Sequence, residues 1–223
     1  MNTLFPATLA VALLAASGAA AGTTRYESAA ALSSATPVTH QVDFEGLPIN
    51  THMTSLDLGG VRFDPLSGTP YGGYATNDLT IVDGTNPYIS PTPGSRALSS
   101  NGDEDIRIRL QDGETFNAIG FDVITNADPR APIIYLFGVG GGLIESFTLS
   151  QGPNSLGYFG VTSTAKIAYV DYISFGGAIQ NTALDNVTVG VSAAPEPSVW
   201  ALLLIGFGAA GGAVRSARRR ATV

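Results

Sequence analysis

The chain of 223 residues contains no cysteine and little positive charge. Without cysteine it can have no disulfide bridge, thiol nucleophile or cysteine-ligated zinc. Residues 22–194 hold seven basic and seventeen acidic side chains, a net charge of about −10. Such a surface lacks the basic footprint that nucleic acids and anionic membranes require. We therefore expect no nucleic-acid partner and a fold held together by hydrophobic burial, alone or with the help of a hard cation.

Recognisable catalytic motifs are also missing. The two histidines are not part of a His-Glu-x-x-His sequence, and neither a Gly-x-Ser-x-Gly elbow nor a P-loop occurs. Gly138-Val-Gly140 is followed by residues that break the dinucleotide-binding fingerprint. A glycosidase requires two carboxylates at a defined separation, and no spacing in the sequence points to such a pair. We therefore predict no enzymatic activity; a carbohydrate-active hydrolase with a concealed carboxylate pair is the alternative.

Short apolar segments with a period of two recur from residue 39 onward. Ile106, Ile108 and Leu110 alternate with two arginines, which is typical of a half-buried strand. Leu156 to Val161 and Ile167 to Phe175 are expected as two further strands, and Pro65 to Ser95 as a long irregular loop. Turns rich in Gly, Pro, Asn and Asp separate the segments. This rhythm predicts an all-β fold, an antiparallel β-sandwich spanning 39–191.

The segment before this domain, 22–38, is small, polar and rich in alanine. We expect it to be a lead-in, with a short helix from Arg25 to Ser33.

Several short motifs of the body resemble the galactose-binding-like jelly-roll modules. They are Val42-Asp-Phe-Glu-Gly-Leu47, Gly60-Val-Arg-Phe63, Ala118-Ile-Gly-Phe-Asp122, Tyr158-Phe-Gly-Val161, Ile167-Ala-Tyr-Val170 and Leu184-Asp-Asn-Val-Thr-Val189. The resemblance implies a jelly-roll-like sandwich. It also implies a possible structural calcium that links the first strand to the last, with Asp43, Glu45 and Asp185 at the matching positions. The alternative is that Asp43 and Glu45 form the solvent face of an edge strand and Asp185 caps a turn.

The tyrosines are candidates for sugar stacking because flat aromatic faces suit pyranose rings. Tyr71 and Tyr74, in a Gly-Tyr-Gly-Gly-Tyr loop, are the best candidates because nothing in the local pattern buries them. Tyrosines at strand positions, such as Tyr135 and Tyr169, are more often core or sheet-face residues.

The N-terminus has the features of a secretory signal peptide. An apolar run from Leu4 to Ala16 precedes small residues, with the cut expected after Ala21, so that the signal spans 1–21. Met-Asn-Thr carries no Lys or Arg, and an uncleaved anchor is the alternative.

The C-terminal segment, 192–223, contains a Pro-Glu-Pro break, an apolar span over 199–214 and a basic tail over 215–220. At about 1.5 Å per residue the span is slightly shorter than a hydrocarbon core. Its order resembles the PEP-CTERM sorting signal of Gram-negative bacteria. The matching residues are Pro195, Glu196, Pro197, Trp200, Ala201, Arg215, Arg218, Arg219 and Arg220. A plain membrane anchor or a buried helix are the alternatives.

The PEP-CTERM resemblance implies export and a transient inner-membrane anchor with a cytoplasmic C-terminus, formed by a single transmembrane helix. It further implies cleavage by an exosortase-type membrane enzyme and release to the cell surface or the medium. Because such sorting accompanies exopolysaccharide production, we expect a non-catalytic component or binder of the extracellular polysaccharide matrix. A purely structural surface protein is a further alternative.

Overall fold

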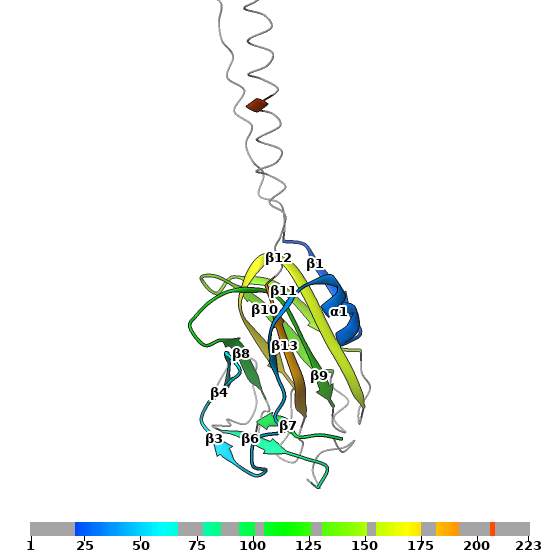
Figure 1. Cartoon of the computed structure of the whole chain (residues 1–223), viewed down its shortest axis with the longest axis vertical. Helices are drawn as coiled ribbons and strands as arrows, with labels where there is room; N and C mark the ends of the chain where they lie inside the picture. Colours follow the sequence, from blue (N-terminus) through cyan, green and yellow to red (C-terminus); the bar gives the residue numbers. More distant parts are fainter. Residues whose placement is uncertain are drawn as a thin grey trace, which may run out of the picture.

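The computed structural model describes residues 21–66, 78–85, 94–100, 105–125, 131–150, 155–174, 182–191 and 206–207. In these ranges the chain forms thirteen strands and a seven-residue helix at the N-terminal side, as Figure 1 shows. The elements are β1 (Thr23–Tyr26), α1 (Ala29–Ala35), β2 (Val38–Val42), β3 (His52–Met53), β4 (Leu56–Leu58), β5 (Val61–Pro65), β6 (Leu79–Val82), β7 (Ala97–Ser100), β8 (Ile106–Leu110), β9 (Phe116–Ile124), β10 (Ile133–Gly138), β11 (Leu143–Thr148), β12 (Leu156–Ile173) and β13 (Ala183–Gly190).

The strands pair exclusively in antiparallel fashion among the described residues, which confirms the predicted all-β class. The hydrogen-bonded path runs β3-β6-β7-β13-β9-β12-β8-β5-β4. Outside this path β2 pairs with β13, β1 with β12, and β10 with both β11 and β12. The strand pattern of Ile106–Leu110 is also confirmed, because its three aliphatic residues are buried and its two arginines are partly exposed.

Strand β12 belongs to two layers of the fold. Its first part, Leu156–Thr162, pairs with β9, whereas Ile167–Ile173 pairs with β10 and, in part, with β8. The sequence predicts two strands here, and the structure corrects this to one strand of 18 residues that arches from one layer to the other. The small and polar residues Thr162–Lys166 resemble a turn, but they continue the strand through the bend.

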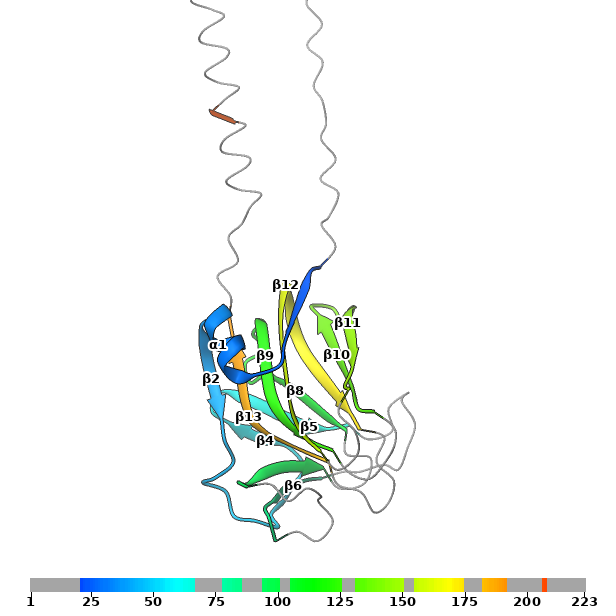
Figure 2. The ribbon, with the colours of Figure 1, turned by 90° about the vertical axis from the view of Figure 1, so that its right-hand side faces the viewer.

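We call the two layers the first and the second sheet. The first sheet contains β1, β2, β3, β6, β7, β9, β13 and the first part of β12; the second contains β4, β5, β8, β10, β11 and the second part of β12. Figure 2 shows the two layers from the side.

Aromatic rings fill the space between the sheets. Phe121 of β9 lies edge-on to Tyr172 of β12 with centroids 6.2 Å apart, and Phe147 of β11 meets Phe159 at 5.5 Å. All but Phe147 are fully buried. Burial of such a side chain contributes about 1.5–3 kcal/mol, so this contiguous core supplies the stability that disulfides cannot provide here.

The N-terminal segment is part of the sandwich and does not merely lead into it. Strand β1 pairs with β12 from Thr23 to Tyr26. Helix α1 begins at Ala29 and buries Leu32. Its N-cap is Ser28, whose hydroxyl accepts a hydrogen bond from the Ala31 N–H. The expected helix from Arg25 to Ser33 therefore starts later than its sequence indicates, because residues 23–26 satisfy their backbone groups in the sheet.

The region expected as an irregular loop, 65–95, also differs from its prediction. It contains strand β6, which pairs with β7 over four residues. Its Leu79 and Ile81 are fully buried.

The two ends of the described sandwich lie side by side. Thr23 of β1 pairs with Ser163, and Gly190 of β13 pairs with Ala118. Both of these pairs lie near the start of β9. Figures 1 and 2 place both at the same end of the molecule. The predicted signal peptide and the predicted sorting segment lie outside the described residues, apart from residue 21 and Gly206–Phe207. In the part of the chain that the structure describes, no helix is long and apolar enough to cross a membrane.

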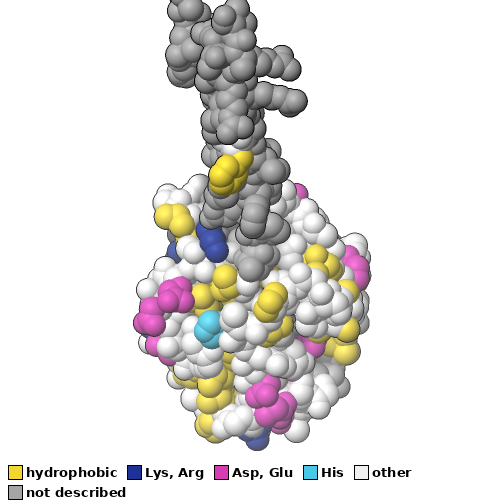
Figure 3. All heavy atoms as spheres, turned by 45° about the horizontal axis from the view of Figure 1, so that its top comes forward, with side chains coloured by type: hydrophobic (Ala, Val, Ile, Leu, Met, Phe, Trp, Pro, Cys, Tyr) yellow, Lys and Arg dark blue, Asp and Glu magenta, His cyan; other side chains and the backbone are white. Residues whose placement is uncertain are grey.

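Figure 3 views the end of the molecule that carries these two termini. On the described surface visible there, acidic side chains are spread around the rim and basic ones stand singly, without forming a continuous patch. This distribution agrees with the acidic composition of the body.

Candidate functional site

The candidate site lies on the outer surface of the first sheet, at the end of β9 that is distant from the two termini. Asp122 of β9 stands opposite Asp185 of β13 in the strand register. Helix α1 covers the other end of the same surface, where Leu32 packs with Ala118 and Tyr158. The site is therefore the part of this sheet surface that the helix leaves open.

A β-bulge aims the side chains of β13 into the site. The register between β13 and β9 shifts between Asp185 and Thr188, and Asn186 has a φ of 50°. A positive φ is uncommon outside glycine, and asparagine tolerates it better than most residues. Bulges of this kind redirect side chains and are frequent beside functional sites. Here the bulge brings Asp185 and Asn186 to the side on which Asp122 lies.

One side-chain amide connects the two carboxylates. Asn186 Nδ2 donates to Asp122 Oδ2 at 2.8 Å and lies 3.4 Å from Asp185 Oδ2. The Ser95 hydroxyl donates to Asp185 Oδ2 at 2.5 Å, and the Asn186 backbone N–H donates to Oδ1 at 2.6 Å. The position of each carboxylate is thus fixed before any ligand binds.

Asp185 is an acid that the fold buries. Its side chain is buried, with 4% of the residue exposed. Burial raises the pKa of the Asp185 carboxyl, and the charges of Asp122 and Glu45 raise it further, against the opposing hydrogen bonds from Ser95 and the Asn186 backbone. A perturbed carboxylate in a concave site marks a candidate functional position.

These groups line a cavity of about 350 Å³. Its lining residues are Gly94, Ser95, Asp122, Ile124, Leu156, Gly157, Asp185 and Asn186. Leu156 is 59% exposed and supplies, with Ile124, the apolar wall of the cavity. The volume suits one small ligand or one sugar unit of a longer chain. Carboxylate acceptors, an amide donor and an apolar wall together can bind the hydroxyl groups and the carbon face of a sugar.

Hydrogen bonds between Glu45 and Arg96 lie next to the lining residues Gly94 and Ser95 in the sequence. The Arg96 backbone N–H donates to Glu45 Oε1 at 2.8 Å. The Arg96 guanidinium donates to the carbonyl of Glu45 at 2.7 Å and to that of Leu47. These bonds connect the segment after β2 to the segment before β7, which carries Gly94 and Ser95.

The predicted calcium ligands are only partly brought together. Asp185 and Glu45 are close enough for their charges to interact, whereas Asp43 is exposed and takes no part in the cavity lining. Within the described ranges, no group of three or more His, Cys, Asp or Glu side chains could hold a metal ion. The calcium hypothesis stays a prediction.

Sequence reasoning identified Asp185 and Glu45 but missed Asp122, Asn186 and Ser95. The available signal was an acidic residue inside an apolar strand, at Asp122 between Phe121 and Val123. The other predicted site residues lie outside the described ranges: Tyr71, Tyr74, Pro195, Glu196, Pro197, Trp200, Ala201, Arg215, Arg218, Arg219 and Arg220.

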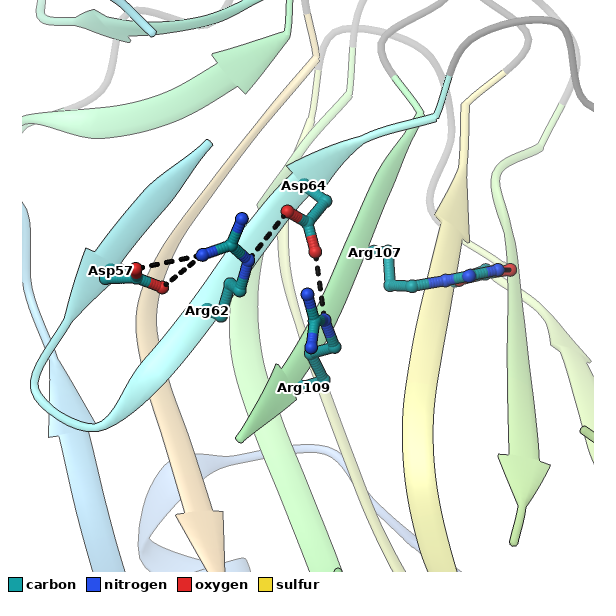
Figure 4. A network of polar contacts seen from close by, with 6 residues as sticks. Asp57, Arg62, Asp64, Arg107 and Arg109 are labelled. Carbon is teal, nitrogen blue, oxygen red and sulfur yellow. Dashed lines mark hydrogen bonds and ion pairs between the residues drawn. The ribbon is translucent and has the colours of Figure 1, made fainter. Parts of the chain in front are cut away.

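The outer surface of the second sheet carries a network of ion pairs, which Figure 4 shows. Arg62 lies between Asp57 and Asp64, with N–O distances of 3.0 and 2.9 Å, and Arg109 reaches the other oxygen of Asp64 at 3.0 Å. Hydrogen bonding to Asp64 and its charge, followed by the charge of Asp57, raise the pKa of Arg62. These partly exposed pairs come from neighbouring strands and cross-link β4, β5 and β8.

A second pair on this surface is more buried. Arg107 binds the Asp171 carboxylate through two nitrogens at 2.7 and 2.9 Å, and the Asp171 side chain is 2% exposed. The Arg107 guanidinium also lies 4.0 Å above the ring of Tyr169, whose other neighbour, Phe137, stacks at 4.8 Å. Tyr169 thus contacts a cation and a second aromatic ring within the second sheet, and these contacts strengthen the sheet.

No protein-family model and no curated protein matches the sequence. Several solved structures are similar in three dimensions. The K2 cleaved adhesin domain of Lys-gingipain is 14% identical, with 68% of this chain and 98% of that chain covered and a TM-score of 0.43. The C-terminal family 22 carbohydrate-binding module of Clostridium thermocellum Xyn10B is 14% identical over 68% and 98%, with a TM-score of 0.34. The mannan-recognising module TmCBM27 is 12% identical over 68% and 95%, with a TM-score of 0.34.

Proposed function

We propose that this protein is an exported, non-catalytic glycan binder that acts through the cavity between β9, β12 and β13. The observation that carries the proposal is the convergence of two fixed carboxylates, one amide and an apolar wall in a cavity of about 350 Å³. Sugar hydroxyls pair with such carboxylates and amides, and the carbon face of the ring packs on apolar side chains. The site lies at the end of the sandwich away from the two termini, so a tether at either terminus leaves it accessible.

The export part of the proposal rests on the two terminal segments of the sequence. An N-terminal apolar run followed by small residues, and a Pro-Glu-Pro break followed by a span and arginines, favour export, a transient anchor and exosortase-type processing. A polysaccharide of the extracellular matrix is the glycan that this placement favours.

A glycoside hydrolase is the second candidate, because Asp122 and Asp185 share one amide nitrogen and the pKa of Asp185 is raised. Glycoside hydrolysis requires a glycosidic bond between an acid and a nucleophile or base. Here Asn186 already connects the two carboxylates, and 4% exposure leaves Asp185 little access to a substrate. The geometry therefore favours binding over catalysis.

A glycan array probed with the full chain tests the proposal. We expect binding to a limited set of polysaccharides without release of reducing ends. Asp122→Ala should weaken binding at least about tenfold, since a hydrogen bond to a charged group contributes about 1.5–3 kcal/mol. Asp112→Ala is the matched control, because Asp112 is an exposed acid outside the cavity lining. Equal binding by both variants, or release of reducing ends, would contradict the proposal.

A further inference from the structure

We propose that the cavity between β9, β12 and β13 selects a sugar unit that carries a protonated amine. This inference rests on the proposed function, because it names the class of sugar for the same cavity. Its starting point is the cavity wall, where Asp122 and Asp185 stand opposite each other and no described lining residue is cationic. A ligand that brings its own positive charge complements this wall, whereas a neutral ring leaves the negative charge uncompensated.

The carboxylates receive only neutral hydrogen-bond donors from the described protein. Asp185 is contacted by the Ser95 hydroxyl and the Asn186 N–H, and Asp122 by the Asn186 amide. The nearby Arg96 directs its guanidinium to the carbonyls of Glu45 and Leu47 instead. Two charges held together in this way repel each other. An ammonium group reduces this repulsion and forms charge-assisted hydrogen bonds, which are about twice as strong as neutral ones.

The same wall favours an organic cation over a metal ion. Calcium takes six to eight oxygen ligands at about 2.3–2.6 Å, and no group of three acidic or histidine side chains could hold a metal in the described residues. Leu156 and Ile124 form an apolar wall that a bare ion cannot use. The carbon face of an amino sugar can pack on that wall while its ammonium group reaches Asp122. The cavity of about 350 Å³ also has room for a whole ring.

Binding of three matched monosaccharides to the full chain tests this inference by titration calorimetry. Glucosamine carries a protonated amine below neutral pH, N-acetylglucosamine carries a neutral amide at the same carbon, and glucose carries a hydroxyl. We expect glucosamine to bind about tenfold more tightly than the other two, because its ammonium group can form a charge-assisted bond to the Asp122 carboxylate in place of a neutral one. Added salt should reduce this difference, because it screens the ion pair.

Asp122→Asn keeps the shape of the side chain and one acceptor oxygen but removes a charge. We expect it to reduce the preference for glucosamine to less than about threefold, whereas the control Asp112→Asn should leave the preference unchanged. If Asp122→Asn does not fold, the comparison of glucosamine with N-acetylglucosamine in the unaltered chain still decides the question.

Each other outcome has a definite meaning. Equal affinity for glucosamine and N-acetylglucosamine would overturn the amine preference and leave the proposed glycan binding intact. Absence of binding to any glycan, including the polymers of the array, would overturn both. Binding of calcium alone, lost in Asp185→Asn, would overturn the amine inference and support the calcium prediction.

Discussion

At the scale of single residues, the fold buries the acidic side chains of Asp171 and Asp185. Asp171 is buried with a cation in contact, whereas Asp185 is buried with neutral donors and other acids around it. The first arrangement strengthens the sheet. The burial of Asp185 makes the folded state less stable but gives the cavity a charged wall. Such locally unfavourable arrangements are frequent at functional sites.

The Asp185 carboxyl should make stability depend on pH. Its pKa is raised above the ordinary 3.8, so the folded state binds this proton more tightly than the unfolded state. Its favourable contribution is complete below about 3.8 and is lost as the pH rises through the folded pKa. Asp185→Asn, which keeps an acceptor for Ser95, should therefore raise Tm relative to the unaltered chain more at neutral pH than at acid pH. Thermal melts across this range measure it; an advantage that grows on acidification would contradict the assignment.

Arg107 should contribute more to the free energy of unfolding than Arg109 does. Removing Arg107 leaves the buried Asp171 charge without its bidentate partner, and the cost of breaking such a pair is about 3–5 kcal/mol. Arg109→Ala removes only one of two arginines from the partly exposed Asp64, for which about 0–1 kcal/mol is expected. Urea denaturation of Arg107→Ala and Arg109→Ala compares them. Equal free energies of unfolding would show that the burial of Asp171 has no energetic effect.

At the scale of elements, helix α1 depends on one glycine beneath it. A Cβ at Gly120 would lie 2.0 Å from the Tyr158 hydroxyl and 2.6 Å from a methyl group of Leu32. Overpacking of this kind typically costs about 1–3 kcal/mol. Gly120→Ala should therefore lower the free energy of unfolding by that amount and loosen α1, with faster amide exchange in residues 29–35. Gly142→Ala is the control, because nothing lies within 4 Å of its Cβ position; equal effects would refute the packing argument.

The elements also show what sequence patterns can and cannot predict. The period of two in Ile106–Leu110 is confirmed as a strand because one face of it meets the core. The bend of β12 was not predictable, since residues 162–166 have the composition of a turn. Strands β1 and β9 pair with β12 only as far as Ser163, and the next residues bond to Gly22 and Asn117. The candidate site depends on a register between Asp122 and Asp185 and on a bulge at Asn186. The local sequence period predicts neither the register nor the bulge, because both features arise only when strands distant in the sequence pair.

At the scale of the whole molecule, both ends of the sandwich lie together and the candidate site lies at the other end. This arrangement suits a protein that is held by a terminal segment while its binding surface points away. The sorting proposal predicts a released species that ends near residue 195. Replacement of Pro195, Glu196 and Pro197 by alanines should abolish its release, as measured by cell fractionation and intact mass. A full-length product in the membrane in both cases would identify the tail as an ordinary anchor.

The most direct test of the account is the amide-exchange footprint of the bound glycan that the array selects. The full chain is compared with and without this glycan, so that the protected segments locate the binding surface. The account predicts slower exchange at the end of β9, the start of β12 and around the bulge of β13, over 122–125, 156–158 and 184–187. Protection confined to β8, β10 and the second part of β12 would place the glycan on the ion-paired face of the second sheet and contradict the proposed site.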